Sequence, residues 1–321
     1  MSPKILVIGE LNVDIVATGL RSAPEMGAEI LAEDCELTLG SASAIFAVGM
    51  ARLGHKVTFV SHVGRDYFGD FCIRALQQLG VATRHVTRKV DEKTGVTIAL
   101  SGKRDRALVT HSGAVATLTS DAIDQRLMKR HDHLHLTSYY LQQALQPSFA
   151  DIFRRAKELG LTTSFDPNSD PGNKWSKSID NVLRYTDVLF VNEREASQIT
   201  RSLDMSVPPA GAGGSMISLK AALKTLGTKV PCAVIKRGPR GAMAIQNGKT
   251  ASDAGFKITT VDTTGAGDSF DAGFVSAYLS QKPLAECLRI GNACGALSAT
   301  RIGGTTGQPN ATELQTFLRS N

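Results

Sequence analysis

The sequence predicts a three-layer α/β/α fold with a mainly parallel central sheet and a small additional β-sheet. Short β-branched runs alternate with stretches that carry apolar residues at helical spacing, and several of these stretches end in Leu-Gly. The alternation is typical of parallel strands joined by crossover helices, and glycine after a helix supplies a left-handed C-terminal cap. With 321 residues the chain can bury a large core, so we expect a single domain over residues 1–321.

The expected elements follow in chain order. Six apolar runs are expected to be buried strands, namely Lys4–Ile8, Lys56–Ser61, His133–Leu136, Thr162–Phe165, Val188–Val191 and Ala233–Ile235. Five stretches have the spacing of helices, namely Ala44–Leu53, Phe68–Leu79, Pro147–Leu159, Lys220–Leu226 and Asp268–Leu279. Four helices are expected to end at the glycine of a Leu-Gly pair, which is Gly54, Gly80, Gly160 or Gly227. The run FKITTV at 256–261 also predicts a strand.

Two segments, at about 14–39 and 95–110, have strand-like alternation but lack crossover helices. We expect them to form a small sheet outside the main one, as a lid over the site. The Pro/Gly/Ser-rich stretch at 206–215 is expected to be an exposed loop.

Composition excludes several classes of protein. Apolar residues make up 42% of the chain and charged residues 21%, which rules out a disordered tail. The net charge of +6 comes from scattered basic residues, so it fits an anionic small substrate as well as a polymer, and no nucleic-acid partner is expected. Five cysteines without a C-x-x-C pair, together with the lack of a membrane span or signal peptide, predict a cytoplasmic protein.

The segment VDTTGAGDSF at 261–270 carries the strongest chemical signal. The backbone amides of Gly265, Ala266 and Gly267 would point outward where a helix begins, and unpaired amides at that end of the helix dipole bind anions. A carboxylate at Asp268 would repel a phosphate. This placement makes sense if the carboxylate takes a proton from a hydroxyl that attacks the phosphate. The alternative is a glycine-rich turn in which Asp268 only caps the helix.

Seven ordered segments resemble the ribokinase-like carbohydrate kinase family, also called the phosphofructokinase-B type. They are GELNVD at 9–14, LGSASA at 39–44, VGRD with FG at 63–69, DPN at 166–168 with Trp175, NERE at 192–195, KRGPRG at 236–241 and DTTGAGD at 262–268. No Walker-type P-loop or G-x-G-x-x-G fingerprint is present in the sequence.

The resemblance implies an ATP-dependent sugar kinase, with Asp268 as general base and Gly265, Ala266 and Gly267 around the transferred phosphoryl group. It implies that Glu195 organises Mg²⁺ through water. It assigns the remaining site residues to three sets: Asn192, Lys236, Gly238, Gly241 and Asn292 at ATP; Asn12, Asp14, Gly40, Ser41 and Tyr139 at the sugar; and Asp262 at a monovalent cation such as K⁺. Members often pair through lid strands, so a homodimer is expected.

Each role has an alternative. N-x-x-E is often a helix cap, Asp14 can stabilise a turn, Lys236 can be a solvated lysine, and Tyr139 can belong to the core. The three histidines at 131, 133 and 135 would share one face of a strand, and we expect a structural role for them rather than a metal site.

The sequence departs from the family pattern at three positions. Ser41 replaces a glycine, Ile45 replaces an asparagine that contacts sugar in relatives, and Asp170 stands where an arginine is usual. The identity of the sugar acceptor therefore stays open. A nucleoside kinase, with Phe46 and Tyr140 as candidates to flank a base, and a non-catalytic sugar-binding regulator are the alternative functions.

Overall fold

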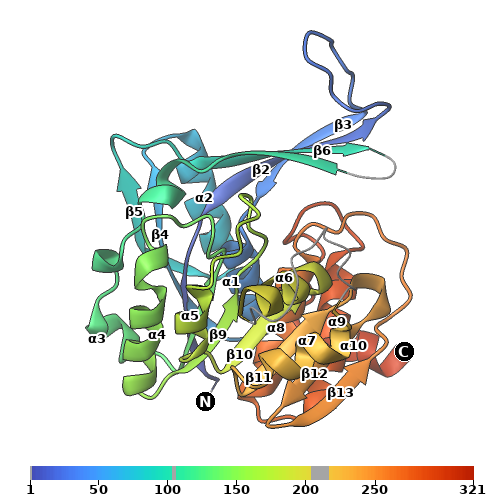
Figure 1. The fold of residues 1–321 in the computed structure, drawn as a ribbon. Coiled ribbons are helices and arrows are strands. Elements are labelled where there is room, and N and C mark those ends of the chain that lie inside the picture. Colours follow the sequence, from blue (N-terminus) through green and yellow to red (C-terminus); the bar gives the residue numbers. More distant parts are fainter. Residues whose placement is uncertain (1, 103–105, 204–216) are drawn as a thin grey trace.

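The computed structural model describes residues 2–102, 106–203 and 217–321, so the loop predicted at 206–215 lies outside the described residues. Within them the centre of the molecule is a nine-stranded sheet in the order β13-β12-β11-β10-β9-β8-β1-β4-β5 (Figure 1). The strands from β11 to β5 along this order run parallel, and β12 and β13 add an antiparallel edge. Their bounds are β1 Lys4–Ile8, β4 Lys56–Gly64, β5 Ala82–Lys89, β8 His133–Thr137, β9 Thr162–Asp166, β10 Val188–Asn192, β11 Cys232–Lys236, β12 Ala242–Gln246 and β13 Lys249–Asp253.

Helices cover both faces of this sheet because alternate strand residues pack in opposite directions. Val188 and Phe190 of β10 belong to one core cluster, and Leu189 and Val191 belong to the other. The first cluster lies under α1 Ala42–Arg52, α2 Tyr67–Gln78, α8 Ala266–Leu279, α9 Leu284–Ser298 and α10 Ala311–Ser320. The second lies under α3 Gln125–Met128, α4 Phe149–Glu158, α5 Ile179–Leu183, α6 Glu193–Leu203 and α7 Leu219–Leu226. The predicted three-layer fold is confirmed.

A second, four-stranded sheet projects from the main body (Figure 1) in the order β3-β2-β6-β7. It is formed by β2 Asn12–Leu20, β3 Asp34–Leu39, β6 Gly95–Gly102 and β7 Arg106–His111. These strands come from the two segments expected outside the main sheet. The central pair β2–β6 is parallel, and the two outer pairs are antiparallel.

Two local predictions need correction. Gly54, Gly80 and Gly160 have the expected positive φ, but Gly227 has φ −67° and ends its helix in a right-handed turn. Residues 256–261 are not a strand, because the sheet already ends at β13 and the amides of Val261 and Asp262 bond to the carbonyl of Ala299 after α9.

The histidines at 131, 133 and 135 have structural hydrogen-bond partners, although β8 begins only at His133 and His131 precedes it. His133 and His135 both bond to the hydroxyl of Ser164, at 2.7 and 2.6 Å, and His131 bonds to Thr58 at 2.9 Å. Among the residues with described positions, no helix is both long and apolar enough to traverse a bilayer.

The topology sets where a site can form. The adjacent parallel strands β9, β10 and β11 end at Asp166, Asn192 and Lys236, and Asn192 and Lys236 are direct neighbours in the register. Ligands of open α/β sheets bind outside the carboxyl ends of the strands, so these three polar residues mark the candidate site.

Candidate active site

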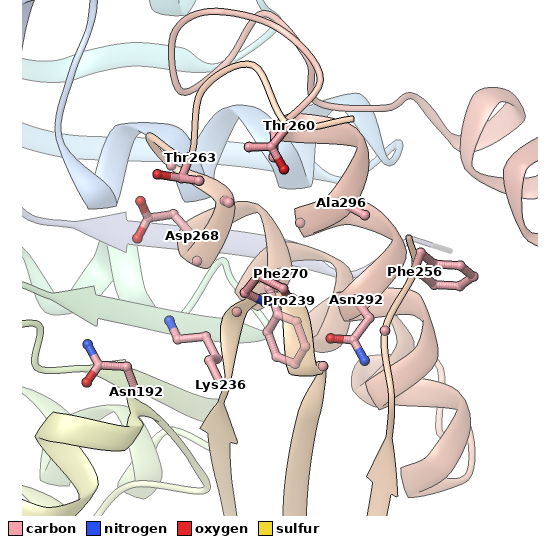
Figure 2. Close-up of a pocket in the computed structure, with 18 of the residues that line it drawn as sticks. Asn192, Lys236, Pro239, Phe256, Thr260, Thr263, Asp268, Phe270, Asn292 and Ala296 are labelled. Carbon is pink, nitrogen blue, oxygen red and sulfur yellow. The ribbon is translucent and has the colours of Figure 1, made fainter. Parts of the chain in front are cut away.

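A cavity of about 630 Å³ lies between these strand ends and the N-terminus of α8 (Figure 2). Asn192, Lys236 and Asp268 line one part of it, and Asn292 lines another. A volume of this size is typical of a pocket for a small organic ligand.

The helix α8 begins as the glycine pattern predicts. Gly265 is the N-cap with φ 68°, and Asp268 lies in the first turn. The amide of Ala266 bonds to the carbonyl of Thr263 at 3.2 Å, so the expectation that this amide is open needs correction. Within the described part of the chain, the amides of Gly265 and Gly267 have no backbone acceptor. Two donors at the positive end of the helix dipole therefore remain for an anion.

The space beside Gly265 excludes any side chain. A Cβ there would lie 2.8 Å from Cα of Gly304 and 2.9 Å from Cγ2 of Ile45. Ile45 is thus buried and packed against the start of α8, and the loss of a polar sugar contact at this position stays a prediction. Gln308 fixes the same region by donating to the carbonyl of Ile45 and bonding to the hydroxyl of Ser269, both at 2.9 Å.

The carboxyl group of Asp268 is part-buried at the edge of the cavity (Figure 2). Burial raises its pKa to about 7, and the nearby carboxylates of Asp166, Glu10 and Glu195 add to this, while the ammonium of Lys236 opposes it. A group with this pKa can both hold and release a proton near neutral pH.

Behind Asp268 lies a buried ion cluster. Nζ of Lys236 is 2.6 Å from Oδ2 of Asp166 and 3.0 Å from Oδ2 of Asp271. Burial raises the pKa of Asp271 well above its ordinary value, and Lys236 partly offsets this. Lys236 is therefore not a solvated lysine. It lines the cavity while paired with two buried carboxylates, and its expected place beside the nucleotide stays a prediction.

Asn192 and Glu195 form a reciprocal helix cap. The amide of Asn192 donates to Oε2 of Glu195 at 2.8 Å, and the amide of Glu195 donates to Oδ1 of Asn192 at 2.9 Å. Glu195 is nonetheless buried beside the cavity, and burial and the carboxylate of Asp166 raise its pKa to about 7. The two side chains therefore form the helix cap that was the alternative to a metal role. Both residues also line the cavity.

Glycines shape the other end of the cavity. Gly238 and Gly241 have φ 56° and 76°, and a Cβ on Gly241 would lie 2.0 Å from the carbonyl oxygen of Asp253. Asn292 donates to Oδ1 of Asp253 at 2.6 Å, which fixes its side chain at the cavity wall. These three predicted residues line the same cavity as Asp268.

The residues expected at the sugar form a separate group at the root of the second sheet. Nδ2 of Asn12 donates to Oδ1 of Asp14 at 3.0 Å, and a Cβ on Gly40 would lie 2.1 Å from that same oxygen. Ser41 has φ 79°, and its hydroxyl bonds to the carbonyl of Glu10. They do not line the described cavity, although α1, which begins beside Ser41, packs on α8 through Ile45.

Two aromatic residues that were candidates for ligand contacts, Tyr139 and Phe46, belong to the core. Tyr139 is 3% exposed, packs edge-on against Phe149, and bonds to the hydroxyl of Ser178 at 2.9 Å. The expected sugar contact of Tyr139 is therefore corrected to a core role. Phe46 is fully buried and stacked on His135, so it cannot flank a nucleoside base.

The carboxylates of two other acidic residues accept hydrogen bonds from loop amides. The carboxylate of Asp262 accepts from the amides of Thr264 and Gly303, each at 2.9 Å, so its side chain fixes the loop expected at the monovalent cation. The cation itself stays a prediction. Asp170 accepts from the amides of Gly172, Lys174 and Trp175 at 2.7–2.8 Å. The acid that replaces the usual arginine is thus the organising residue of its own loop.

Comparison with known proteins agrees with this geometry. A family model described as "pfkB family carbohydrate kinase" matches residues 2–311. The chain belongs to this family. It is therefore a phosphotransferase that acts on a sugar hydroxyl.

Relatives in this family differ in their sugar. The chain is 28% identical over 322 residues to the ribokinase of Haemophilus influenzae, covering 99% of each chain, and 27% identical to the fructokinase of Vibrio alginolyticus, covering 98% and 99%. The crystal structure of the ribokinase from Thermotoga maritima, 26% identical, superposes with a TM-score of 0.81 and covers 99% of each chain.

Sequence reasoning gave no role to Asp166 and did not name Asp271. Both could have been found, because Asp166 ends a buried strand beside Asn192, and Asp271 follows Asp268 by three residues and so shares its helix face. The signal for Gln308 was absent, because its partners are far away in sequence.

Proposed function

We propose that this kinase transfers the γ-phosphoryl group of ATP to a hydroxyl of a sugar or sugar derivative, with Asp268 as general base. One observation carries the proposal: two open amides at the start of α8 and a carboxyl group with a pKa of about 7 share one cavity. Phosphoryl transfer needs donors for the charge on the transferred group and an acceptor for the proton of the attacking hydroxyl.

The residues divide this work between them. The amides of Gly265 and Gly267 stabilise negative charge on the transferred phosphoryl group, and the helix dipole adds to their effect. Asp268 accepts the proton of the sugar hydroxyl. Gly238, Gly241 and Asn292 receive the rest of the nucleotide, since glycine lets the backbone approach a ligand closely.

The donor set around the cavity fits a magnesium ion that accompanies ATP. Four carboxyl groups, those of Asp166, Asp268, Asp271 and Glu195, lie around a single lysine. Burial and mutual repulsion raise the pKa of Glu195, Asp268 and Asp271, so a divalent cation would relieve the repulsion between them. The oxygens of Glu195 already accept bonds from Asn192 and Ser169, which favours contact with the ion through its water. Magnesium would neutralise phosphate charge.

The polar group at the root of the second sheet supports a polyol acceptor. Asp14 accepts hydroxyl hydrogen bonds, and Asn12 can both donate and accept. These two residues with Gly40 and Ser41 are our candidates for sugar binding. The burial of Phe46 gives no support to a nucleoside acceptor.

The test is ADP release in Mg²⁺ and K⁺ with a panel of sugars, phosphosugars and nucleosides. We expect turnover with a sugar, and loss of about 10²–10⁴-fold in kcat for Asp268→Asn with ATP binding retained. The matched control is Asp70→Asn, which removes a carboxylate that pairs with Arg88 on the surface. Sugar binding without ADP release would favour the regulator, and an Asp268→Asn variant with most of its kcat would exclude Asp268 as the base.

A further inference from the structure

The ammonium group of Lys236 has surroundings that the reaction as proposed above does not use. It lies at the end of β11 between two carboxylates that are each only 1% exposed, at 2.6 Å from Asp166 and 3.0 Å from Asp271. The ring of Phe190 lies 5.9 Å below it. The lysine is therefore fixed from several sides and does not swing freely in the cavity.

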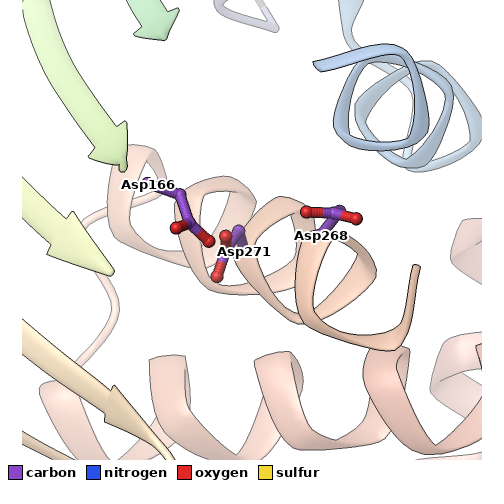
Figure 3. Close-up of side chains that lie close together, drawn as sticks. All are labelled: Asp166, Asp268 and Asp271. Atoms are coloured by element: carbon purple, nitrogen blue, oxygen red, sulfur yellow. The ribbon is translucent and has the colours of Figure 1, made fainter. Parts of the chain in front are cut away.

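The carboxylates around it have the arrangement of a cation site. Asp166, Asp268 and Asp271 each present one oxygen, and these three oxygens lie within 4.8 Å of one another (Figure 3). Oδ1 of Asp271 is buried and has no hydrogen-bond partner among the described residues. Three carboxylate oxygens at this spacing suit a hard divalent ion, yet the cation present is an ammonium group of the chain itself.

This cation also lies against the anion site. A Cβ built on Gly267 would be 3.3 Å from Nζ of Lys236, so the ammonium lies beside the residue whose amide is open at the start of α8. In Figure 2 the side chain of Lys236 extends toward the same region as Asp268. One fixed positive charge thus adjoins both the proposed base and the amides proposed to hold the phosphoryl group.

We propose that Lys236 is a resident cation that takes the place of a second divalent ion at the phosphoryl-transfer site, and that Asp271 is the positioning residue that holds it there with Asp166. The inference rests on the proposed function, because it names the cation that balances the carboxylates of the proposed phosphoryl-transfer site. A covalently attached cation does not dissociate between turnovers, so the enzyme needs only the divalent ion that arrives with the nucleotide.

Replacing the ammonium by a neutral side chain of similar length tests the inference. In Lys236→Met the three carboxylates lose their cation, and we expect the nucleotide-free protein to bind one more Mn²⁺ per chain than the wild type, counted by titration with electron paramagnetic resonance. At 1 mM Mg²⁺ we expect kcat to fall at least 100-fold with the sugar KM within threefold, and raised Mn²⁺ to restore at least tenfold.

Two further variants act as controls. Lys229→Met removes a lysine that pairs with Asp180 at 2.8 Å away from the cavity, and we expect wild-type Mn²⁺ stoichiometry and kcat. The double variant Lys236→Met/Asp271→Asn lacks one of the three carboxylates, and we expect the additional Mn²⁺ to be lost. A purely structural ion pair would not create a metal site that depends on Asp271.

Asp271→Asn alone keeps the shape of the side chain and serves if Lys236→Met does not fold. We expect kcat about tenfold lower with both KM values within threefold. The inference is overturned if Lys236→Met folds and binds no additional Mn²⁺ or keeps kcat within threefold, or if Asp271→Asn keeps kcat within twofold. Mn²⁺ stoichiometry does not require turnover, so it separates this inference from a failure of the proposed function.

Discussion

Replacing Gly265 by alanine is the sharpest test of the anion site at α8. A Cβ at this position would be about 0.6 Å closer to Cα of Gly304 than ordinary contact at about 3.4 Å, and nearly as close to Ile45. Neither neighbour can retreat easily, because Gly304 is backbone and Ile45 is a core residue. The start of α8 must therefore shift, and a displacement approaching 1 Å at a catalytic group costs about 10²-fold in rate.

We expect Gly265→Ala to lower kcat by about 10–100-fold in the ADP-release assay. The residue also has φ 68°, and alanine in this region costs roughly 1–2 kcal/mol. Gly160→Ala separates the two effects, because Gly160 has φ 84° and nothing within 4 Å of its Cβ position. Both variants should lose stability in urea, and only Gly265→Ala should lose activity. If Gly265→Ala keeps kcat within threefold, the amides of this helix start are not the phosphoryl site.

Three other predictions follow from particular residues. Burial raises the pKa of Asp268 to about 7, so the carboxyl group is protonated below this pH. The value of kcat/KM should therefore fall about tenfold per pH unit on the acid side. A flat profile of kcat/KM from pH 8 to 5.5 would argue against Asp268 as the base. Asp170→Ala removes the acceptor of three backbone amides and should lower the free energy of unfolding by about 1–3 kcal/mol. The fluorescence emission of the single tryptophan, Trp175, should shift to the red. Unchanged emission would mean that Asp170 does not order the loop. Ser41→Gly should change the free energy of unfolding by less than about 1 kcal/mol, because relief of φ 79° is offset by loss of the helix cap and of the hydroxyl's bond to the carbonyl of Glu10. A large fall in the urea midpoint would show that the hydroxyl matters more than the strain.

The sequence predicted the architecture well because its signals are local. Strands such as Val188–Asn192 are nearly continuous apolar runs, because both faces of the sheet are covered by helices. The antiparallel edge strands β12 and β13 were not predicted, since short partly exposed strands such as Lys249–Asp253 have little apolar pattern. The run at 256–261 had a strand pattern, but the amides of Val261 and Asp262 at its end bond to the carbonyl of Ala299 after α9 and not to a strand.

Part of the site could also be predicted, namely the helix start at Gly265 and the placement of Asp268 in its first turn. What could not be predicted was how side chains share partners across the fold. The pairing of Lys236 with Asp271 joins a strand end to a helix, and the core position of Tyr139 depends on Phe149 and Ser178. Such choices depend on tertiary packing, which no short sequence pattern encodes.

Gln308 has a consequence for how the enzyme becomes active during synthesis. Its amide joins Ile45, near the beginning of the chain, to Ser269 in the catalytic helix. A ribosome must therefore release the chain beyond position 308 before this joint can close, so shorter nascent chains lack the support that it gives to the start of the catalytic helix.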